Sequence, residues 1–172
     1  MTKTGDKEFY VLSPKKPLND SDFLVQTKNF QPNLAVNQRL AFSLRINPTV
    51  CMTQNGRKSR HDVLMHAKIQ AKKQGITDKF KIRDLMTAAA QAWLLDEKRQ
   101  SDWGINFDFP PDIESYQQHQ YPKKNGQIIQ FSSIDVQGML TLQNAQRFMQ
   151  KYAEGFGRAK GFGCGLMLIR KI

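Results

Sequence analysis

The sequence is 172 residues long and carries 26 Lys and Arg against 15 Asp and Glu, a formal net charge of +11. This length suits one or two small domains, whose core can form without disulfides. The two cysteines are isolated, and nothing resembles a signal peptide or an apolar run of about eighteen residues, which favours a reduced setting over a disulfide-stapled or membrane-spanning protein. We therefore expect a cytoplasmic protein whose positive field attracts a polyanion such as nucleic acid.

The N-terminal part predicts three strands. Short apolar runs indicate strands over Phe9–Ser13 and Phe23–Thr27. Arg39–Ile46 alternates apolar and polar residues, which is the period of a half-buried strand. Asn47-Pro48 then ends this third strand.

Two helices are predicted next along the chain. Ser59 is a candidate N-cap, with Asp62 at the acidic position of a capping box, for a helix that runs to Gln74. The second helix, Ile82–Lys98, is rich in Ala and has an apolar stripe. Cations gather around the start of the first helix, and we predict RNA contacts from three of them: Arg57, Lys58 and Arg60.

The following segment predicts an extended arm and a hairpin. Asn106–Phe109 and Ile113–Tyr121 indicate an irregular arm, and Ile128–Leu142 a long return strand. Lys124-Asn125-Gly126 is a hairpin-turn signal. Two cations at this tip are further candidate RNA contacts: Lys123 and Lys124.

The C-terminus adds a helix and a strand. Asn144 is the expected N-cap of a short helix that ends at Glu154, and Leu166–Ile169 forms the last strand. From Arg39 onward the order is strand, helices, strand, strand, helix, strand. This order predicts an α+β domain over residues 38–172 with the ferredoxin-like (RRM-like) βαββαβ plan.

A glycine-rich loop separates the last helix from the last strand. Five glycines fall within the eleven residues from Gly155 to Gly165, interleaved with two cations. Such a backbone allows close approach of a phosphate chain. The loop supplies six candidate RNA-binding residues: Gly155, Gly157, Arg158, Lys160, Gly161 and Gly163.

The sequence of this loop allows other interpretations. P-loops and dinucleotide-binding loops place their glycines before a helix, whereas these glycines follow one. The segment beginning Lys160-Gly161-Phe162 starts like an RNA-recognition signature, but Cys164 replaces its stacking aromatic. In a structural alternative, Gly155 is a helix C-cap, and the other glycines are present because a buried turn has no room for side chains. The two flanking phenylalanines are equally open to base stacking or core packing: Phe156 and Phe162.

Histidines and acids give no metal or cofactor site. His61 and His66 lack the spacing of a zinc helix, and His119 stands alone. We expect all three to be surface or capping residues. The sequence therefore predicts no metal and no small-molecule cofactor.

Three ordered motifs carry a family resemblance. The segments are Leu44–Pro48, Gly56–Val63 and Gly155–Leu166, and Phe9–Ser13 with Pro17 adds to them. Together they resemble the CasE family, the repeat-processing endoribonuclease subunit of the Cascade-type CRISPR surveillance complex. The resemblance covers about residues 9–172.

The resemblance implies two tandem ferredoxin-like domains, of which residues 1–37 are part of the first. It implies binding of the CRISPR repeat RNA stem-loop, partnership with Cascade-type protein subunits, and metal-independent cleavage at the 3′ base of the stem. The products would be a 2′,3′-cyclic phosphate and a 5′-hydroxyl.

The catalytic part of this resemblance is incomplete. The chain is expected to start at the later strand of the first domain, so the segment with the family's catalytic His has no counterpart, and the catalytic residues are unknown. Two hypotheses remain: an RNA-processing subunit, and a non-catalytic RNA-binding or assembly module, either a remnant or one half of a split protein.

Overall fold

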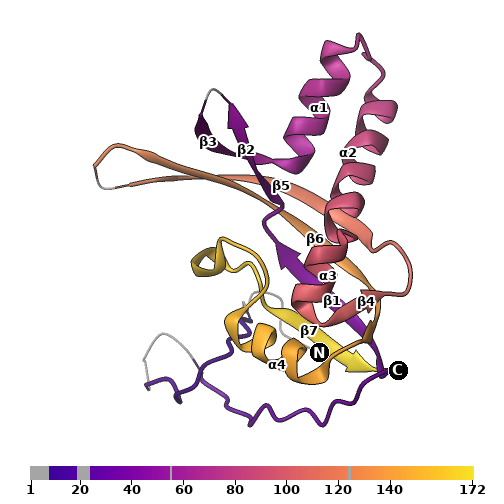
Figure 1. Ribbon diagram of the computed structural model, residues 1–172. Coiled ribbons are helices and arrows are strands. Elements are labelled where there is room, and N and C mark those ends of the chain that lie inside the picture. Colours follow the sequence, from indigo (N-terminus) through magenta and orange to yellow (C-terminus); the bar gives the residue numbers. More distant parts are fainter. Residues whose placement is uncertain (1–7, 19–23, 55, 124) are drawn as a thin grey trace. The chain divides into compact units, whose positions relative to one another are not determined.

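The computed structural model in Figure 1 describes residues 8–18, 24–54, 56–123 and 125–172. The chain divides into two units, Met1–Asn33 and Leu34–Ile172. The described residues of the first unit form no helix or strand, so the predicted strands Phe9–Ser13 and Phe23–Thr27 are wrong there; Phe23 itself lies outside the described residues. Val11 and Leu24 are 81% and 92% exposed, so their side chains bury too little area to stabilise a strand.

The second unit is built on an antiparallel sheet of five strands. Its order is β4 (Ile105–Phe107), β6 (Ile128–Leu142), β1 (Arg39–Ile46) and β7 (Met167–Lys171), and β5 (Asp112–Pro122) also pairs with β6. The alternation of apolar and polar residues predicted for Arg39–Ile46, which is β1, is confirmed. Four apolar side chains of β1 are buried: Leu40, Phe42, Leu44 and Ile46.

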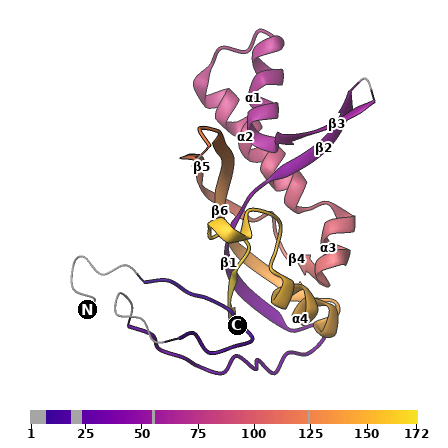
Figure 2. The same cartoon turned by 90° about the vertical axis from the view of Figure 1, so that its left-hand side faces the viewer.

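Four α-helices accompany the sheet: α1 (Val63–Lys73), α2 (Lys79–Leu94), α3 (Glu97–Trp103) and α4 (Ala145–Glu154). The order of strands and helices from Arg39 onward follows the predicted order with three differences: an additional hairpin, a second predicted helix divided into α2 and α3, and a predicted arm divided into β4 and β5. Figures 1 and 2 show α1 and α2 projecting as a pair at one end of this unit, with α4 toward the other end.

The additional hairpin joins β2 (Thr49–Gln54) to β3 (Arg57–Asp62). The prediction that Ser59 caps a helix is wrong, because Ser59 pairs with Met52 inside this hairpin. Asp62 is the N-cap instead, and its side chain accepts a 2.6 Å hydrogen bond from the backbone N–H of Met65. The basic stretch before α1 is therefore a strand.

The predicted helix Ile82–Lys98 is two helices. It starts earlier than expected, where Asp78 caps α2, and it is interrupted after Leu95. Asp96 begins α3, since its carboxylate accepts a 2.9 Å hydrogen bond from the N–H of Arg99. A side chain that accepts hydrogen bonds from the free N–H groups of a first turn stabilises the beginning of a new helix.

The arm expected to be irregular forms two strands, β4 and β5, and keeps one irregularity. β5 is eleven residues long and pairs with β6, with one bulge between Ile113 and Ser115. The turn lies where it was predicted: Lys123 N–H donates to the carbonyl of Gln127 at 2.7 Å, and Gly126 has φ +77°. Lys124 lies outside the described residues.

The core on one face of the sheet holds the glycine-rich loop in place. Phe148 and Tyr152 of α4 are buried, as is Phe156 at the start of the loop. The ring of Phe156 lies 4.9 Å from that of Trp103, centroid to centroid. Of the two interpretations of Phe156, core packing is therefore confirmed.

Candidate nucleic-acid interface

The inner glycines of the loop are fixed by packing. Gly155 ends α4 with φ +78°, as the C-cap interpretation has it. Gly157 has φ +75°, and a Cβ there would lie 2.9 Å from Cγ1 of Ile46. Gly165 has φ +92°, and a Cβ there would lie 2.6 Å from the carbonyl oxygen of Phe156. The fold itself accounts for glycine at these positions.

The outer glycines lie in open space. The short 3-10 turn η1 (Lys160–Phe162) carries Gly161, and Gly163 follows it. A Cβ on either glycine would meet no atom of the described chain within 4 Å. Gly163 needs its φ of +81°, whereas Gly161 has no positive φ. This outer half of the loop is therefore the part that a ligand can approach closely.

The two cations of the loop have different surroundings. Arg158 is exposed and its backbone forms an isolated bridge with Asn47. Lys160 is exposed as well, but its ammonium group donates to the backbone carbonyl of Glu154. That carbonyl belongs to the last turn of α4, where a cation is favoured by the helix dipole. Arg158 is thus the cation of the loop that is more available to a phosphate.

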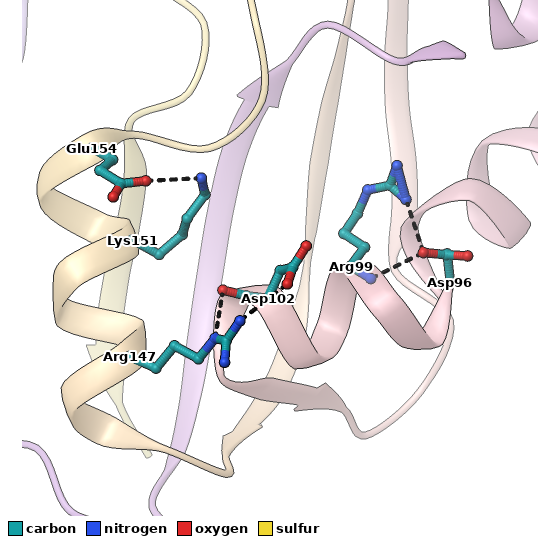
Figure 3. Close-up of polar contacts among 6 residues, drawn as sticks. All are labelled: Asp96, Arg99, Asp102, Arg147, Lys151 and Glu154. Carbon is teal, nitrogen blue, oxygen red and sulfur yellow. Dashed lines mark hydrogen bonds and ion pairs between the residues drawn. The ribbon is translucent and has the colours of Figure 1, made fainter. Parts of the chain in front are cut away.

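A groove of about 500 Å³ lies beside Arg158. Residues of α3 and α4 line it, together with Asn47, Thr49 and Trp93. Figure 3 shows how ion pairs tie the charged side chains of these two helices. The pairs are Arg147 with Asp102 at 3.1 Å, Lys151 with Glu154 at 3.1 Å, and Arg99 with Asp96 at 3.7 Å.

Arg99 is the most constrained cation of this groove. Its guanidinium carbon lies 3.7 Å from the ring centroid of Trp93, and Nη1 donates to the carbonyl of Trp93 at 2.6 Å. Burial lowers the pKa of Arg99, against the opposing effects of Asp96 and Asp102. Arg99 therefore acts as a packed structural cation.

The sheet beneath the loop is held by a charged clamp. The backbone N–H of Gly165 donates to the carbonyl of Arg45 at 2.7 Å, and the guanidinium of Arg45 makes two hydrogen bonds to Asp135, at 2.7 and 2.9 Å. The hydrogen bond from Arg45 is the main cause of the lowered pKa of the Asp135 carboxyl. A bidentate pair of this kind fixes β1, β6 and the loop in one arrangement.

Two segments that flank the site contain no acidic residue of their own, although carboxylates of other segments lie near them: Asp62 bonds to Ser132 and Tyr116 of the hairpin, and Asp96 and Asp102 line the groove beside Arg158. The sequence between Ser115 and Ile134, which forms most of the β5–β6 hairpin, contains no Asp or Glu, and none follows Glu154. The hairpin carries five glutamines in this stretch. Amides, hydroxyls and cations without acids are the composition that a phosphate backbone tolerates.

The hairpin tip carries the predicted cation Lys123, which is exposed. Figure 1 shows the β5–β6 hairpin extending beyond the rest of the sheet. Reversing Lys123 and Lys124 to Glu is expected to weaken hairpin-RNA binding, because two attractive charges become repulsive at the end of an arm whose residues 115–134 include no Asp or Glu. Filter binding at two salt concentrations measures this. Unaltered affinity would confine the RNA to other surfaces.

The basic residues of β3 form a separate group. Lys58 and Arg60 are exposed and lie two residues apart on the strand, so both project from the same face of the hairpin. Arg57 opens the same strand. In Figures 1 and 2 this hairpin lies near α1, at the opposite end of the unit from α4. The predicted RNA contacts therefore come from distinct regions, and their role in binding remains a prediction.

The histidines differ in their surroundings. His61 Nε2 lies 2.7 Å from the hydroxyl of Ser59, and its ring is 6.2 Å from that of His66. His119 is half-buried, stacks on Phe131 at 4.6 Å and lies 2.8 Å from the hydroxyl of Ser133. Sequence reasoning missed this packing of His119.

Among the described residues no group of three His, Cys, Asp or Glu side chains could hold a metal ion.

Phe162 is the flanking phenylalanine that remains partly in water, with 47% of its surface exposed. It packs against rings of the β5–β6 hairpin, and these were not predicted as neighbours of the loop.

No helix within the described ranges has the length and apolar character needed to cross a membrane.

Comparisons with known proteins identify the family and the fold. A model of the family described as CRISPR associated protein matches residues 1–171. No curated protein matches the sequence. A structure of the CRISPR endoribonuclease Cse3 bound to a 19-nucleotide RNA is 23% identical with a TM-score of 0.58, and the match covers 83% of this chain and 59% of that one.

Two further structures share the fold. Cas6e from Escherichia coli K-12 is 20% identical with a TM-score of 0.54, over 93% of this chain and 75% of that chain. A chain of a CRISPR RNA-guided surveillance complex, pre-nicking, is 17% identical with a TM-score of 0.58, over 86% and 61%. The present chain thus spans about three fifths of the length of the Cse3 structure. It belongs to the CRISPR-associated protein family and has a Cas6e-like fold.

Proposed function

We propose that this chain is an RNA-binding subunit of CRISPR defence that recognises the stem-loop of a CRISPR repeat and stays bound to it in a Cascade-type complex. The observation that carries the proposal is the open outer half of the glycine-rich loop, Arg158–Gly163, next to the outer part of the β5–β6 hairpin, residues 115–134, which has no Asp or Glu. Close backbone approach and unopposed positive charge are what a phosphate chain requires. Similar structures include an endoribonuclease bound to RNA and a surveillance complex.

The proposal includes a finer domain assignment. Residues 38–172 form a ferredoxin-like domain, and residues 1–37 belong to a second one. Two observations support the assignment of residues 38–172. The strand order is β4-β6-β1-β7, and helices follow β1 and β6 along the chain, as in the βαββαβ plan. RNA is then bound at the loop that precedes the last strand.

The proposed reaction is metal-independent cleavage at the 3′ base of the stem. A base takes the proton from the ribose 2′-OH, the oxygen attacks the adjacent phosphorus, and an acid protonates the 5′ oxygen that leaves. The products are a 2′,3′-cyclic phosphate and a 5′-hydroxyl. Arg158 and the N–H groups of the outer loop would stabilise the negative charge that develops on the phosphate.

The alternative is a non-catalytic RNA-binding or assembly module. The environment of His119 favours it, because this histidine is stacked on Phe131 and its Nε2 is engaged with Ser133. A ring held in this way is a poor general base, since such a base must reach the proton it removes.

The test uses a labelled repeat hairpin and the pure chain in EDTA, with binding and cutting scored separately. Tight binding is expected, and Arg158→Ala should weaken it and lower the slope of log K against log salt by about one contact. Arg170→Ala on β7 is the matched control for lost charge. Absence of hairpin binding would reject the proposal. Binding without cutting, alone and with Cascade subunits, would favour the non-catalytic alternative.

A further inference from the structure

A cluster of four aromatic rings joins the long hairpin to the outer half of the glycine-rich loop. His119 and Tyr121 lie two residues apart on β5, Phe131 faces His119 from β6, and Phe162 comes from η1. The ring centroids of His119 and Phe131 are 4.6 Å apart, and those of Phe131 and Phe162 are 4.9 Å apart. Phe162 lies more than 30 residues beyond the hairpin rings in the sequence, so the fold brings the loop and the hairpin together.

Most ring pairs of the cluster lie roughly parallel, as in a stack, whereas Phe131 and Phe162 are tilted by 37°. The interplanar angle is 17° between Tyr121 and Phe162, 20° between Tyr121 and Phe131, and 24° between His119 and Phe131. Core aromatic pairs commonly adopt edge-to-face arrangements, and Phe156 does so against Trp103 at 72° in this protein. The cluster at the loop therefore differs from the packed core in its geometry.

Two of the four rings are also exposed, whereas His119 and Phe131 are half-buried. Phe162 retains 47% and Tyr121 retains 46% of their accessible surface, although both touch other rings. Isolated exposed apolar residues are normal on protein surfaces, but a contiguous group of them indicates a contact surface.

The charge around the cluster selects its partner. The hairpin segment between Ser115 and Ile134 and the chain after Glu154 contain no Asp or Glu, whereas Lys123 follows Tyr121 by two residues and Arg158 precedes Phe162 by four. A polyanion with flat apolar groups matches such a surface. Single-stranded RNA has this chemistry, because its unpaired bases expose their aromatic faces, whereas the bases of a duplex are stacked on one another.

We propose that Tyr121, Phe131 and Phe162 form a stacking platform that takes the face of an unpaired base of RNA, with His119 closing its inner end. This inference rests on the proposed RNA-binding function and adds a second mode of recognition to it. The outer loop and its cation hold the phosphate chain, and the platform holds a base next to it. Because every base has an aromatic face, the platform is tolerant of sequence.

The decisive variant is Phe162→Leu, which keeps an apolar side chain but removes the aromatic face. Its binding to a short oligoadenylate is expected to weaken about 5- to 150-fold, the range that corresponds to loss of one stacked base. Binding to a long blunt-ended RNA duplex, which offers few unpaired faces, should change little. The Phe162→Trp variant should restore oligoadenylate binding, and its added indole emission should be quenched when the RNA binds.

Phe80→Leu is the matched control, since Phe80 lies on α2 and is 80% exposed. It should bind both RNAs like the unaltered chain. Thermal unfolding of Phe162→Leu checks that the fold is retained. Equal losses for single strand and duplex, or unchanged binding to oligoadenylate, would overturn the platform, the latter pointing to a protein partner for these rings. If the unaltered chain binds no hairpin RNA at all, the proposed function itself fails, which is a separate result.

Discussion

Replacing Gly165 with Ala is expected to lower the free energy of unfolding by about 2–4 kcal/mol, from backbone strain and overpacking together. Gly165 has φ +92°, a conformation that L residues rarely adopt, and its added Cβ would lie 2.6 Å from the carbonyl oxygen of Phe156. That oxygen cannot move away to relieve the clash, because it belongs to the backbone of a buried residue. Urea unfolding followed by circular dichroism measures the loss.

Gly161 provides the control for this change. It has no positive φ and open space around its Cα, so Gly161→Ala should stay within about 0.5 kcal/mol of the unaltered chain. A larger side chain, in Gly161→Val, should then interfere with hairpin RNA while the fold survives. Two results would contradict this division of the loop: full stability of Gly165→Ala, or normal RNA binding by a folded Gly161→Val variant.

The elements that the sequence predicted well are those with a strong local signal. β6 has its predicted bounds Ile128–Leu142, and the cap of α4 is Asn144, which accepts a 2.9 Å hydrogen bond from Arg147 N–H. A period-two pattern beside a turn signal, and a cap beside a helical stripe, are each visible within about fifteen residues. Nothing distant has to be known for such elements.

The elements that were predicted wrongly depend on partners elsewhere in the chain. Residues Arg57–Asp62 are strongly polar and carry no alternation of apolar side chains, yet they pair with Thr49–Gln54. The stripe expected on the second helix, which comprised Leu85, Ala88, Ala89, Ala92, Trp93 and Leu95, is confirmed only in part. Ala89, Trp93 and Leu95 pack against the core, whereas Leu85 is 38% exposed and the fully buried positions are Ala90 and Leu94. Which face of a helix is buried is decided by the helices and strands around it.

The glycine-rich loop could be recognised from the sequence, but its division into packed and open halves could not. Gly157 owes its lack of a side chain to Ile46, more than 100 residues earlier. The same holds for Phe162, whose ring neighbours Tyr121 and Phe131 come from the long hairpin. Composition indicated a phosphate-binding loop, and only tertiary structure separates the residues that hold it from those that are free to meet a ligand.

Replacing Arg57, Lys58 and Arg60 together with Ala is expected to weaken hairpin-RNA binding about 10²-fold at physiological salt and to lower the salt slope by about 2 to 3. Each cation that contacts a phosphate releases counterions from the RNA, so losing three contacts reduces both quantities together. The effect should be nearly the same for hairpins of different sequence, since phosphates carry no sequence information. Fluorescence anisotropy across a salt series measures the slope.

The matched control removes the same charge from another element. Lys79, Lys81 and Arg83 are exposed on the first turns of α2, and their triple Ala variant has the same net charge as the β3 variant. If the β3 cations contact phosphates, only the β3 variant loses salt slope, because long-range attraction is common to both variants while counterion release requires contact. Equal losses in the two variants would mean that the net charge of the chain alone attracts RNA. An unchanged slope in the β3 variant would make Lys58 and Arg60 solvated residues of a hairpin, and the RNA would then be held by the outer glycine-rich loop and the β5–β6 arm.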